Sequence, residues 1–296
     1  MSTTTHFRLQ TWNLWWGGTK VNNGEQKMAD IMSKVGGDIL CTQECNDTHA
    51  RSLSAQLHWH HAQQGPDCAI SSSYPVEQIE TDTSPFATAA WCHVDGTRVL
   101  VWSVHLAPWD YGPYAALQGE SAEKINNAPE ELQRQEQIAH VLKLTSQLTE
   151  ESTPVIIAGD FNSPATVDWV GRNDRPDYHW PPTDAVVNAG YTDAFREIHR
   201  DPNAVWGDTW STIEPLDKEP RDRIDFVFVK NLQVGDAVVR GVRVTETEDY
   251  PVPEWQPESP QKQAFVALDE EAHLIPDHTG NTYPSDHQMV EVSLRF

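Results

Sequence analysis

Cysteine and positive charge are both scarce in this 296-residue chain. Its 4 cysteines lie in or beside apolar segments, and no second pair at zinc-binding spacing follows Cys41 and Cys45, so we expect buried thiols in a cytoplasmic protein. No run of 18 apolar residues occurs, which predicts no transmembrane segment. Residues 1–5 lead directly into an alternating strand pattern without the apolar core of a signal peptide, so none is expected.

The shortage of basic residues bears on the class of substrate. Lys and Arg total 21 against 44 acidic residues, a formal net charge of −23. Proteins that bind many phosphates of a nucleic acid usually have a basic face. The densest basic cluster is Arg221-Asp222-Arg223, which an acid interrupts. A small phosphate is therefore expected to be a better substrate than a long nucleic acid, although an acidic surface also serves solubility alone.

Strand and helix patterns alternate along the chain without a Gly/Ser linker or a repeat. Helical spacing occurs at 24–35, 130–148 and, more briefly, 183–188. Strand patterns occur at 7–14, 38–44, 68–70, 89–94, 98–106, 154–158, 223–229, 238–244 and 288–296. These patterns predict an α+β protein in which two packed sheets have helices outside them. We expect one domain over 1–296, with insertions at about 165–182 and 246–281.

Two short motifs place reactive side chains at strand ends. Gly159-Asp160-Phe161-Asn162 follows the apolar run Val155-Ile156-Ile157-Ala158, and Ser285-Asp286-His287 precedes the last strand pattern. Carboxylate and amide oxygens suit a hard cation such as Mg²⁺. Hydrolysis of a phosphoryl group needs such a cation and a base that activates water. The motifs thus indicate metal-dependent phosphoryl chemistry, although an Asx turn that closes a strand would also explain the first one.

Six motifs together resemble those of the endonuclease/exonuclease/phosphatase superfamily, in the family's order and across residues 12–287. Each motif alone is weak, but six in order are specific. Three further stretches, around Asp168-Trp169, at 193–197 and at 209–211, resemble a bacterial branch with the deoxyribonuclease-I-like fold. The six motifs are Trp12-Asn13-Leu14, Asp38-Ile39-Leu40-Cys41-Thr42-Gln43-Glu44, Ser103-Val104-His105-Leu106, Gly159-Asp160-Phe161-Asn162, Arg223-Ile224-Asp225-Phe226 and Ser285-Asp286-His287.

The resemblance implies a four-layer α/β/β/α sandwich of two mixed sheets, and hydrolysis that depends on Mg²⁺ or Mn²⁺. Glu44 matches the metal-binding glutamate, with Asn13 and Asp286 close to the ion. Asp160 and Asn162 match the pair that orients the attacking water and holds a phosphate oxygen. Without the family match, Glu44 could equally be a solvated residue at a strand end, and Asn13 a turn former.

The resemblance also gives roles to two histidines. His287 would contact the phosphate and share a proton with Asp225, whereas a lone histidine is more often structural. His105 matches a second acid or base near the leaving oxygen. In the deoxyribonuclease-I-like branch a carboxylate holds this histidine, and Asp67 is the candidate here. Asp67 could instead be only a turn residue after Gly65-Pro66.

The chain departs from the family pattern at two places. Several members have an acid two residues after the first asparagine, whereas this chain has Trp15, which favours one principal metal ion. A basic residue that often precedes Tyr-Pro is replaced by Ser72-Ser73, which is consistent with a substrate that carries fewer phosphates.

An aromatic loop follows His105 at 106–114, and its Trp109, Tyr111 and Tyr114 are candidate substrate-binding residues. Such rings can stack on a base, a sugar or an acyl group. They could equally pack against the helix expected at 130–148.

Three functions remain open at this point. The first is a phosphodiesterase or phosphatase that acts on a small, sugar- or lipid-linked phosphate by in-line attack of activated water. The second is an endonuclease or exonuclease on DNA or RNA, which would need dispersed arginines to gather into a basic groove. The third is an inactive binding scaffold, but such a protein would be expected to lack some of the site residues, all of which are present. The natural substrate, the number of metal ions and the oligomeric state stay open.

Overall fold

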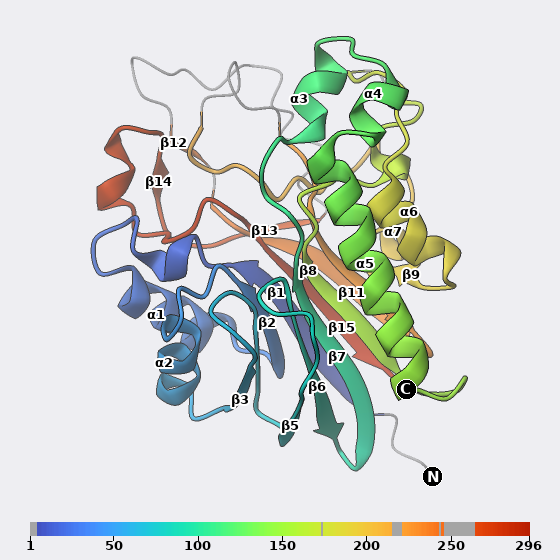
Figure 1. The fold of residues 1–296 in the computed structure, drawn as a ribbon. Coiled ribbons are helices and arrows are strands. Elements are labelled where there is room, and N and C mark those ends of the chain that lie inside the picture. Colours follow the sequence, from blue (N-terminus) through green and yellow to red (C-terminus); the bar gives the residue numbers. More distant parts are fainter. Residues whose placement is uncertain (1–4, 173, 215–220, 243, 246–263) are drawn as a thin grey trace.

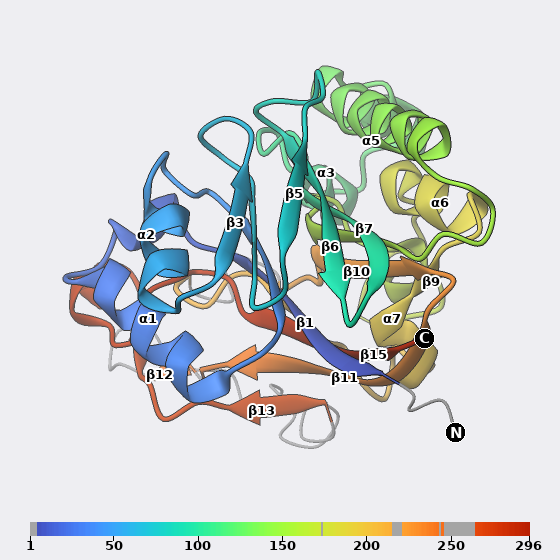
Figure 2. The ribbon, with the colours of Figure 1, turned by 90° about the horizontal axis from the view of Figure 1, so that it is seen from below.

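Two mixed β-sheets lie face to face and helices cover their outer faces in a computed structural model of the chain (Figures 1 and 2). The structure describes residues 5–172, 174–214, 221–242, 244–245 and 264–296. This arrangement is the four-layer α/β/β/α sandwich that the sequence predicts. Within the described ranges, no helix is long and apolar enough to cross a membrane.

The first sheet has seven strands in the order β13-β11-β15-β1-β2-β4-β3. Strand β1 pairs in parallel with β2 and antiparallel with β15, so the first and last long strands of the chain are neighbours. The strands of this sheet are β1 (His6–Asn13), β2 (Ile39–Gln43), β3 (His60–Gln63), β4 (Ala69–Ser72), β11 (Gln233–Gly241), β13 (Phe265–Ala267) and β15 (Met289–Arg295).

The second sheet has six strands in the order β5-β6-β7-β8-β10-β9, with β7 and β8 parallel and β8 and β10 antiparallel. A separate small sheet pairs β12 (Val244–Thr245) with β14 (Ala272–His273). The strands of the second sheet are β5 (Val76–Ile79), β6 (Ala87–Val94), β7 (Thr97–His105), β8 (Val155–Asp160), β9 (Thr192–Asp193) and β10 (Asp225–Lys230).

Helices α1 and α2 lie outside the first sheet, and α5 and α6 lie outside the second (Figure 2). The expected helices are present, because Met28, Ile31 and Met32 form one buried face of α1, and Ile138 and Val141 one of α5. The helices are α1 (Gly24–Val35), α2 (His49–Gln56), α3 (Gly112–Leu117), α4 (Ala122–Asn126), α5 (Pro129–Leu148), α6 (Pro181–Asn188) and α7 (Ala194–Ile198), with short 3-10 turns at Trp16–Gly18, Thr166–Asp168 and Asp277–Gly280.

Strand alternation explains both the core and the site. In β8, Ile156 and Ala158 belong to the cluster between the sheets, whereas Val155 and Ile157 pack outward with residues of α5. The same period of two places Asp160 on the inward side. The inward side of β8 is thus apolar up to Ala158 and becomes polar at Asp160.

Three expectations about element boundaries need correction. The strand predicted at 223–229 begins only at Asp225, because Arg223 makes buried ion pairs with Asp168 and Asp193 instead of continuing the ladder. The strand predicted at 238–244 begins earlier, at Gln233, and ends at Gly241. The aromatic loop predicted at 106–114 ends where α3 begins, so Tyr114 lies on a helix.

The two predicted insertions fall on different kinds of structure. Residues 165–182 hold the short turn at Thr166–Asp168, and their Trp169 and Trp180 are buried in a small aromatic cluster. Of the segment 246–281, residues 246–263 lie outside the described ranges, and the remainder contains β13 and β14. That the whole chain is one domain stays a prediction.

Candidate active site

Three neighbouring strands of the second sheet present one polar side chain each at the same level. His105 at the end of β7 is in register with Asp160 at the end of β8, and Asp160 is in register with Asp225 at the start of β10. All three side chains are buried. The pairing of the three strands therefore places these side chains next to one another.

The first sheet contributes Asn13 from the end of β1, opposite Asp160. Asn13 Nδ2 donates to Asp160 Oδ2 at 3.0 Å and to Glu44 Oε1 at 3.2 Å. The other oxygen of Asp160 accepts from the backbone N–H of Asn162 at 2.8 Å. The amide of Asn162 in turn donates to the carbonyl of Leu106 at 3.0 Å. Asn13 thus connects the two sheets at the point where both end.

Glu44 follows β2 with a positive φ of 51°, a conformation that costs free energy for a residue other than glycine. Its Oε2 accepts from the backbone N–H of Trp16 at 2.9 Å, and its own N–H donates to Asp67 Oδ1 at 3.1 Å. The other oxygen of Asp67 lies 2.7 Å from His105 Nδ1. The contact that the family resemblance implies between His105 and Asp67 is therefore present.

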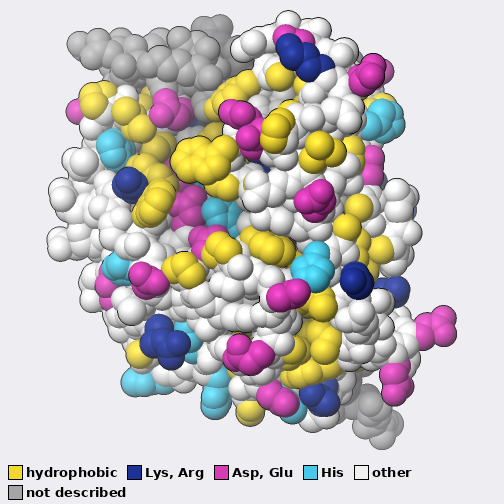
Figure 3. Space-filling model, viewed as in Figure 1, with side chains coloured by type: hydrophobic (Ala, Val, Ile, Leu, Met, Phe, Trp, Pro, Cys, Tyr) yellow, Lys and Arg dark blue, Asp and Glu magenta, His cyan; other side chains and the backbone are white. Residues whose placement is uncertain are grey.

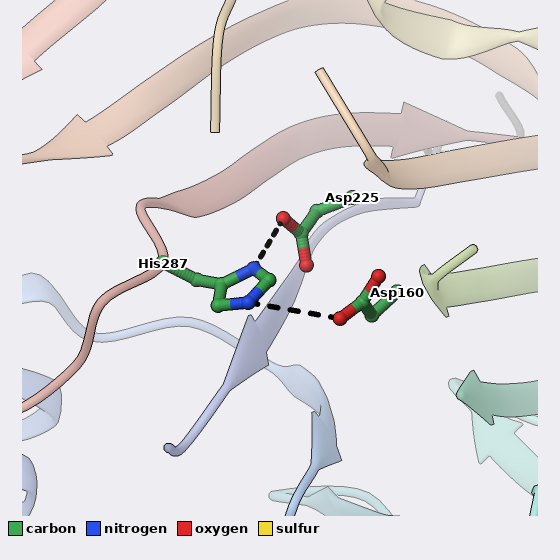
Figure 4. A group of neighbouring side chains, drawn as sticks. All are labelled: Asp160, Asp225 and His287. Atoms are coloured by element: carbon green, nitrogen blue, oxygen red, sulfur yellow. Dashed lines mark hydrogen bonds and ion pairs between the residues drawn. The ribbon is translucent and has the colours of Figure 1, made fainter. Parts of the chain in front are cut away.

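Asp286 and His287 lie just before β15. His287 Nδ1 lies 2.9 Å from Asp225 Oδ2, and its Nε2 lies 3.7 Å from Asp160 Oδ2 (Figure 4). The Nε2 atom of His105 is also 3.7 Å from the same Asp160 oxygen. Two imidazole rings and one amide therefore converge on a single carboxylate oxygen.

Burial and the neighbouring carboxylates control the charges of these groups. Burial alone would lower the pKa of His287, but Asp225 together with Asp286 and Asp160 outweighs it and raises the pKa to about 10. Burial would lower the pKa of His105 as well. The negative charge of Asp67 outweighs this effect and raises the pKa of His105 to about 9. Both imidazoles therefore carry a positive charge at neutral pH.

The pKa values of two carboxyl groups in the site are raised as well, but here burial is the main cause. Burial raises the pKa of Asp160, while the charges of His287 and His105 act against the shift. Burial also raises the pKa of Asp286 to about 7, and the nearby Glu44 adds to the shift. Asp286 Oδ1 is buried and, within the described part of the chain, has no hydrogen-bond partner. A carboxylate oxygen that lacks a hydrogen bond and lies near a second carboxylate suits a divalent cation.

A second group of potential ligands consists of Asp160, Asp225 and His287, whose donor atoms lie within 4.8 Å of one another. Both ring nitrogens of His287 already face carboxylates, Nδ1 at 2.9 Å from Asp225 Oδ2 and Nε2 at 3.7 Å from Asp160 Oδ2. The chemistry of the donors therefore fits a metal better at Glu44, Asp286 and Asn13.

A pocket of about 870 Å³ opens above these groups. Figure 3 shows acidic and histidine side chains among hydrophobic ones in a hollow on this face. Trp109 and Tyr111 line the pocket, as the sequence predicts, but Tyr114 is not among its lining residues and packs edge-on against Tyr111 at 5.2 Å. The pocket is also lined by aromatic residues that the sequence did not indicate, namely Trp15, Trp16, Phe86 and Trp210.

Trp210 is the main residue that sequence reasoning missed. Its indole Nε1 donates to Asp286 Oδ2 at 3.0 Å, and its ring contacts those of Tyr111 and His287 at centroid distances of 5.3 and 6.0 Å. The stretch Thr209-Trp210-Ser211 belongs to the family-like pattern, and this was the available signal. Nothing in the stretch itself indicates which side chain it contacts.

The family model for the Endonuclease/Exonuclease/phosphatase family matches residues 11–287. The chain belongs to this family. Every residue that the family resemblance assigned to catalysis or metal binding lies within the matched range.

The individual proteins that the chain resembles have sequence identities of 31% or less to it. An uncharacterized protein of Caenorhabditis elegans, F14F9.5, is 31% identical over 320 residues, which cover 100% of this chain and 93% of that protein. Two solved structures share the fold. They are D. rerio TDP2 complexed with single strand DNA product (16% identity, TM-score 0.58, 99% and 100% of the two chains) and an AP endonuclease from Archaeoglobus fulgidus (12% identity, TM-score 0.58, 97% and 98%).

Proposed function

We propose that this protein hydrolyses phosphoric esters by metal-assisted in-line attack of water. The observation that carries the proposal is the convergence of His105, His287 and Asn13 on one oxygen of the buried Asp160. A carboxylate surrounded in this way can orient and deprotonate a water molecule. The two imidazolium groups can stabilise the negative charge that develops on the phosphoryl oxygens.

Glu44, Asp286 and Asn13 would hold a divalent cation, Mg²⁺ or Mn²⁺, whose charge would offset that of the phosphoryl oxygens. Asp160 accepts a proton from the attacking water as the new P–O bond forms. His105 Nε2, which is buried and has no hydrogen-bond partner in the described part of the chain, gives a proton to the leaving oxygen as the old P–O bond breaks. Asp225 keeps the Nε2 atom of His287 facing the reaction centre.

This proposal has two forms, which differ in the class of substrate. Cleavage of nucleic acid is supported by the two solved structures that share the fold, since one is an AP endonuclease and the other was solved with a single-stranded DNA product. A small, sugar- or lipid-linked phosphate is supported by the net charge of −23 and by Ser72-Ser73, which stand where family members often have a basic residue. The comparisons thus favour the nuclease that the sequence analysis placed second.

The test is the release of product from three substrates with and without Mg²⁺ or Mn²⁺: bis-p-nitrophenyl phosphate, p-nitrophenyl phosphate and supercoiled plasmid. We expect hydrolysis of at least one substrate, its loss with EDTA and its recovery when metal is added. The same assay on Glu44→Gln should show a loss of several orders of magnitude while the circular dichroism spectrum stays native. No hydrolysis of any substrate with either metal would support the inactive scaffold instead.

A further inference from the structure

The charges of the side chains that line the active-site pocket bear on the kind of substrate it can bind. Among the described residues, none of those that line it is a lysine or an arginine. The acidic residues among them are Glu44, Asp47, Asp67, Glu136, Asp160 and Asp286. The rings of His105 and His287 at the floor, with a cation that Glu44 and Asp286 would hold, can bind one phosphate. Among the described residues further out, a second phosphate would meet acidic and neutral groups and His140, whose Nε2 already lies 2.6 Å from Asp82.

Lys20 is a basic residue that contacts the ring of a pocket-lining residue, Trp16. Its ammonium lies over the ring of Trp16, 5.3 Å from the centroid, and Lys20 is exposed and does not line the pocket. One face of Trp16 is therefore already in contact with a cation. Trp16 and Trp109 are both exposed at the pocket wall, and Trp109 is the more exposed of the two.

Trp109 combines an anchored backbone with an exposed ring. Its carbonyl accepts from the guanidinium of Arg134, which is fully buried and forms an ion pair with Glu131 at 2.6 Å. The same guanidinium donates to the carbonyl of Ala107 at 2.7 Å. The side chain of Trp109 is nevertheless 73% exposed. A large ring on a fixed backbone beside a reaction centre loses little conformational entropy when it stacks on a ligand.

We infer that the pocket selects phosphoric esters in which a single phosphate carries an uncharged flat ring, and that Trp109 holds this ring. The inference rests on the proposed function, because it takes the charged group at the floor to be the substrate's phosphate. A phenyl group and the base of a terminal nucleoside share this chemistry. An internal segment of a polynucleotide does not, because each neighbouring residue brings another phosphate.

Binding without turnover tests the role of Trp109. Phenylphosphonate and methylphosphonate carry the same charged group, but only the first has a ring. Calorimetric titration of the protein with each ligand in the presence of Mg²⁺ therefore measures how much the ring adds to the affinity. We expect phenylphosphonate to bind on the order of tenfold more tightly. Trp109→Ala should remove this preference and Trp109→Phe should keep most of it. The matched control Val187→Ala truncates a half-exposed apolar residue of α6 outside the pocket and should change nothing.

Turnover tests the restriction to a single phosphate. Thymidine 5′-(p-nitrophenyl phosphate) is compared with the same ester bearing a 3′-phosphate, and we expect the additional charge to lower kcat/KM. A rise would reveal a second phosphate site and overturn the inference, as would equal affinity for the two phosphonates. If the phosphonates bind with the expected preference and no ester is hydrolysed, the proposed function fails alone. If esters are hydrolysed without the preference, this inference fails alone.

Discussion

At the scale of single residues, Asp160 shows how the site combines burial with charge. Its side chain is 1% exposed, and both of its oxygens accept hydrogen bonds, one from Asn13 and one from the backbone of Asn162. Burial raises the pKa of Asp160 and so increases its basicity, while the positive charges of His287 and His105 limit this rise. A base of this kind needs its histidine neighbours intact.

The two histidines should differ in importance. His287 is held by the fully buried Asp225, whereas the partner of His105 is the partly exposed Asp67. We therefore expect His287→Ala to lower kcat by about 10²–10⁴-fold and His105→Ala to lower it less. Steady-state kinetics at saturating Mg²⁺ measures both variants. A wild-type rate for His287→Ala would contradict the role given to it.

Trp210 should act on the metal site through Asp286. Trp210→Phe keeps an aromatic ring but removes the N–H that orients Asp286 Oδ2. Loss of such an orienting hydrogen bond weakens metal affinity by about 10–100-fold, so the Mg²⁺ concentration for half-maximal activity should rise accordingly. The control is Trp91→Phe, at a half-buried tryptophan whose ring contacts Arg98 and does not line the pocket. An unchanged Mg²⁺ requirement in Trp210→Phe would exclude this role.

The ion pair of His105 with Asp67 should make stability depend on pH. The pKa of folded His105, about 9, lies above the ordinary value of 6.5. The pair therefore contributes stability that is fully present below about pH 6.5 and is lost as the pH rises through about 9. Asp67→Asn should lower the free energy of unfolding more at pH 6 than at pH 10. Urea unfolding at the two pH values measures the difference, and an equal loss at both would contradict the raised pKa.

At the scale of elements, the close approach of β7 and β8 brings His105 beside Asp160. Gly159 permits it, because a Cβ at this position would lie 1.9 Å from the carbonyl oxygen of Val104 and the backbone φ is 148°. Gly159→Ala should therefore destabilise the protein by about 1–3 kcal/mol or more. Thermal unfolding compares it with Gly280→Ala, where a Cβ would meet nothing within 4 Å. Equal melting temperatures would show that the strands can separate without cost.

The sequence predicted the elements whose patterns are long. Strands β1, β7 and β8 and helices α1 and α5 all show a clear period over their length, and the site residues at the strand ends follow from them. Elements such as α2, β3 and β5 were missed because a segment of four to eight residues is too short to show a clear repeat of apolar residues. The position of Tyr114 was wrong since nothing before Gly112 indicates that a helix begins there.

Apart from the contacts of His105 with Asp67 and of His287 with Asp225, which the family resemblance implies, contacts between distant segments were not predicted. The buried ion pairs of Arg223 with Asp168 and Asp193 join residues at least 30 positions apart. The bond from Trp210 to Asp286 spans 76 positions. Such contacts depend on how the two sheets pack, and no local pattern encodes that packing. The family resemblance proposes which side chains react, whereas the contacts of Arg223 and Trp210 with them or around them were not predicted.

At the scale of the whole molecule, the charge of −23 opposes a polyanionic substrate, whereas the nuclease form of the proposed function requires one. The two influences predict opposite responses to salt. Repulsion between the protein and DNA acts over a Debye length of about 10 Å at 0.1 M salt and weakens as salt is added. A basic groove made of dispersed arginines would instead lose affinity for DNA steeply as salt rises.

Plasmid nicking and hydrolysis of bis-p-nitrophenyl phosphate, measured across a salt series at constant Mg²⁺, distinguish the two. For a site that takes a single phosphate, we expect plasmid nicking to be slow at low salt and no slower at higher salt, with little change for the small diester. The small diester is the internal control, because salt effects on the metal site itself would alter both reactions. Efficient nicking that declines with salt would show that local arginines outweigh the global charge, and long DNA would then be the better substrate.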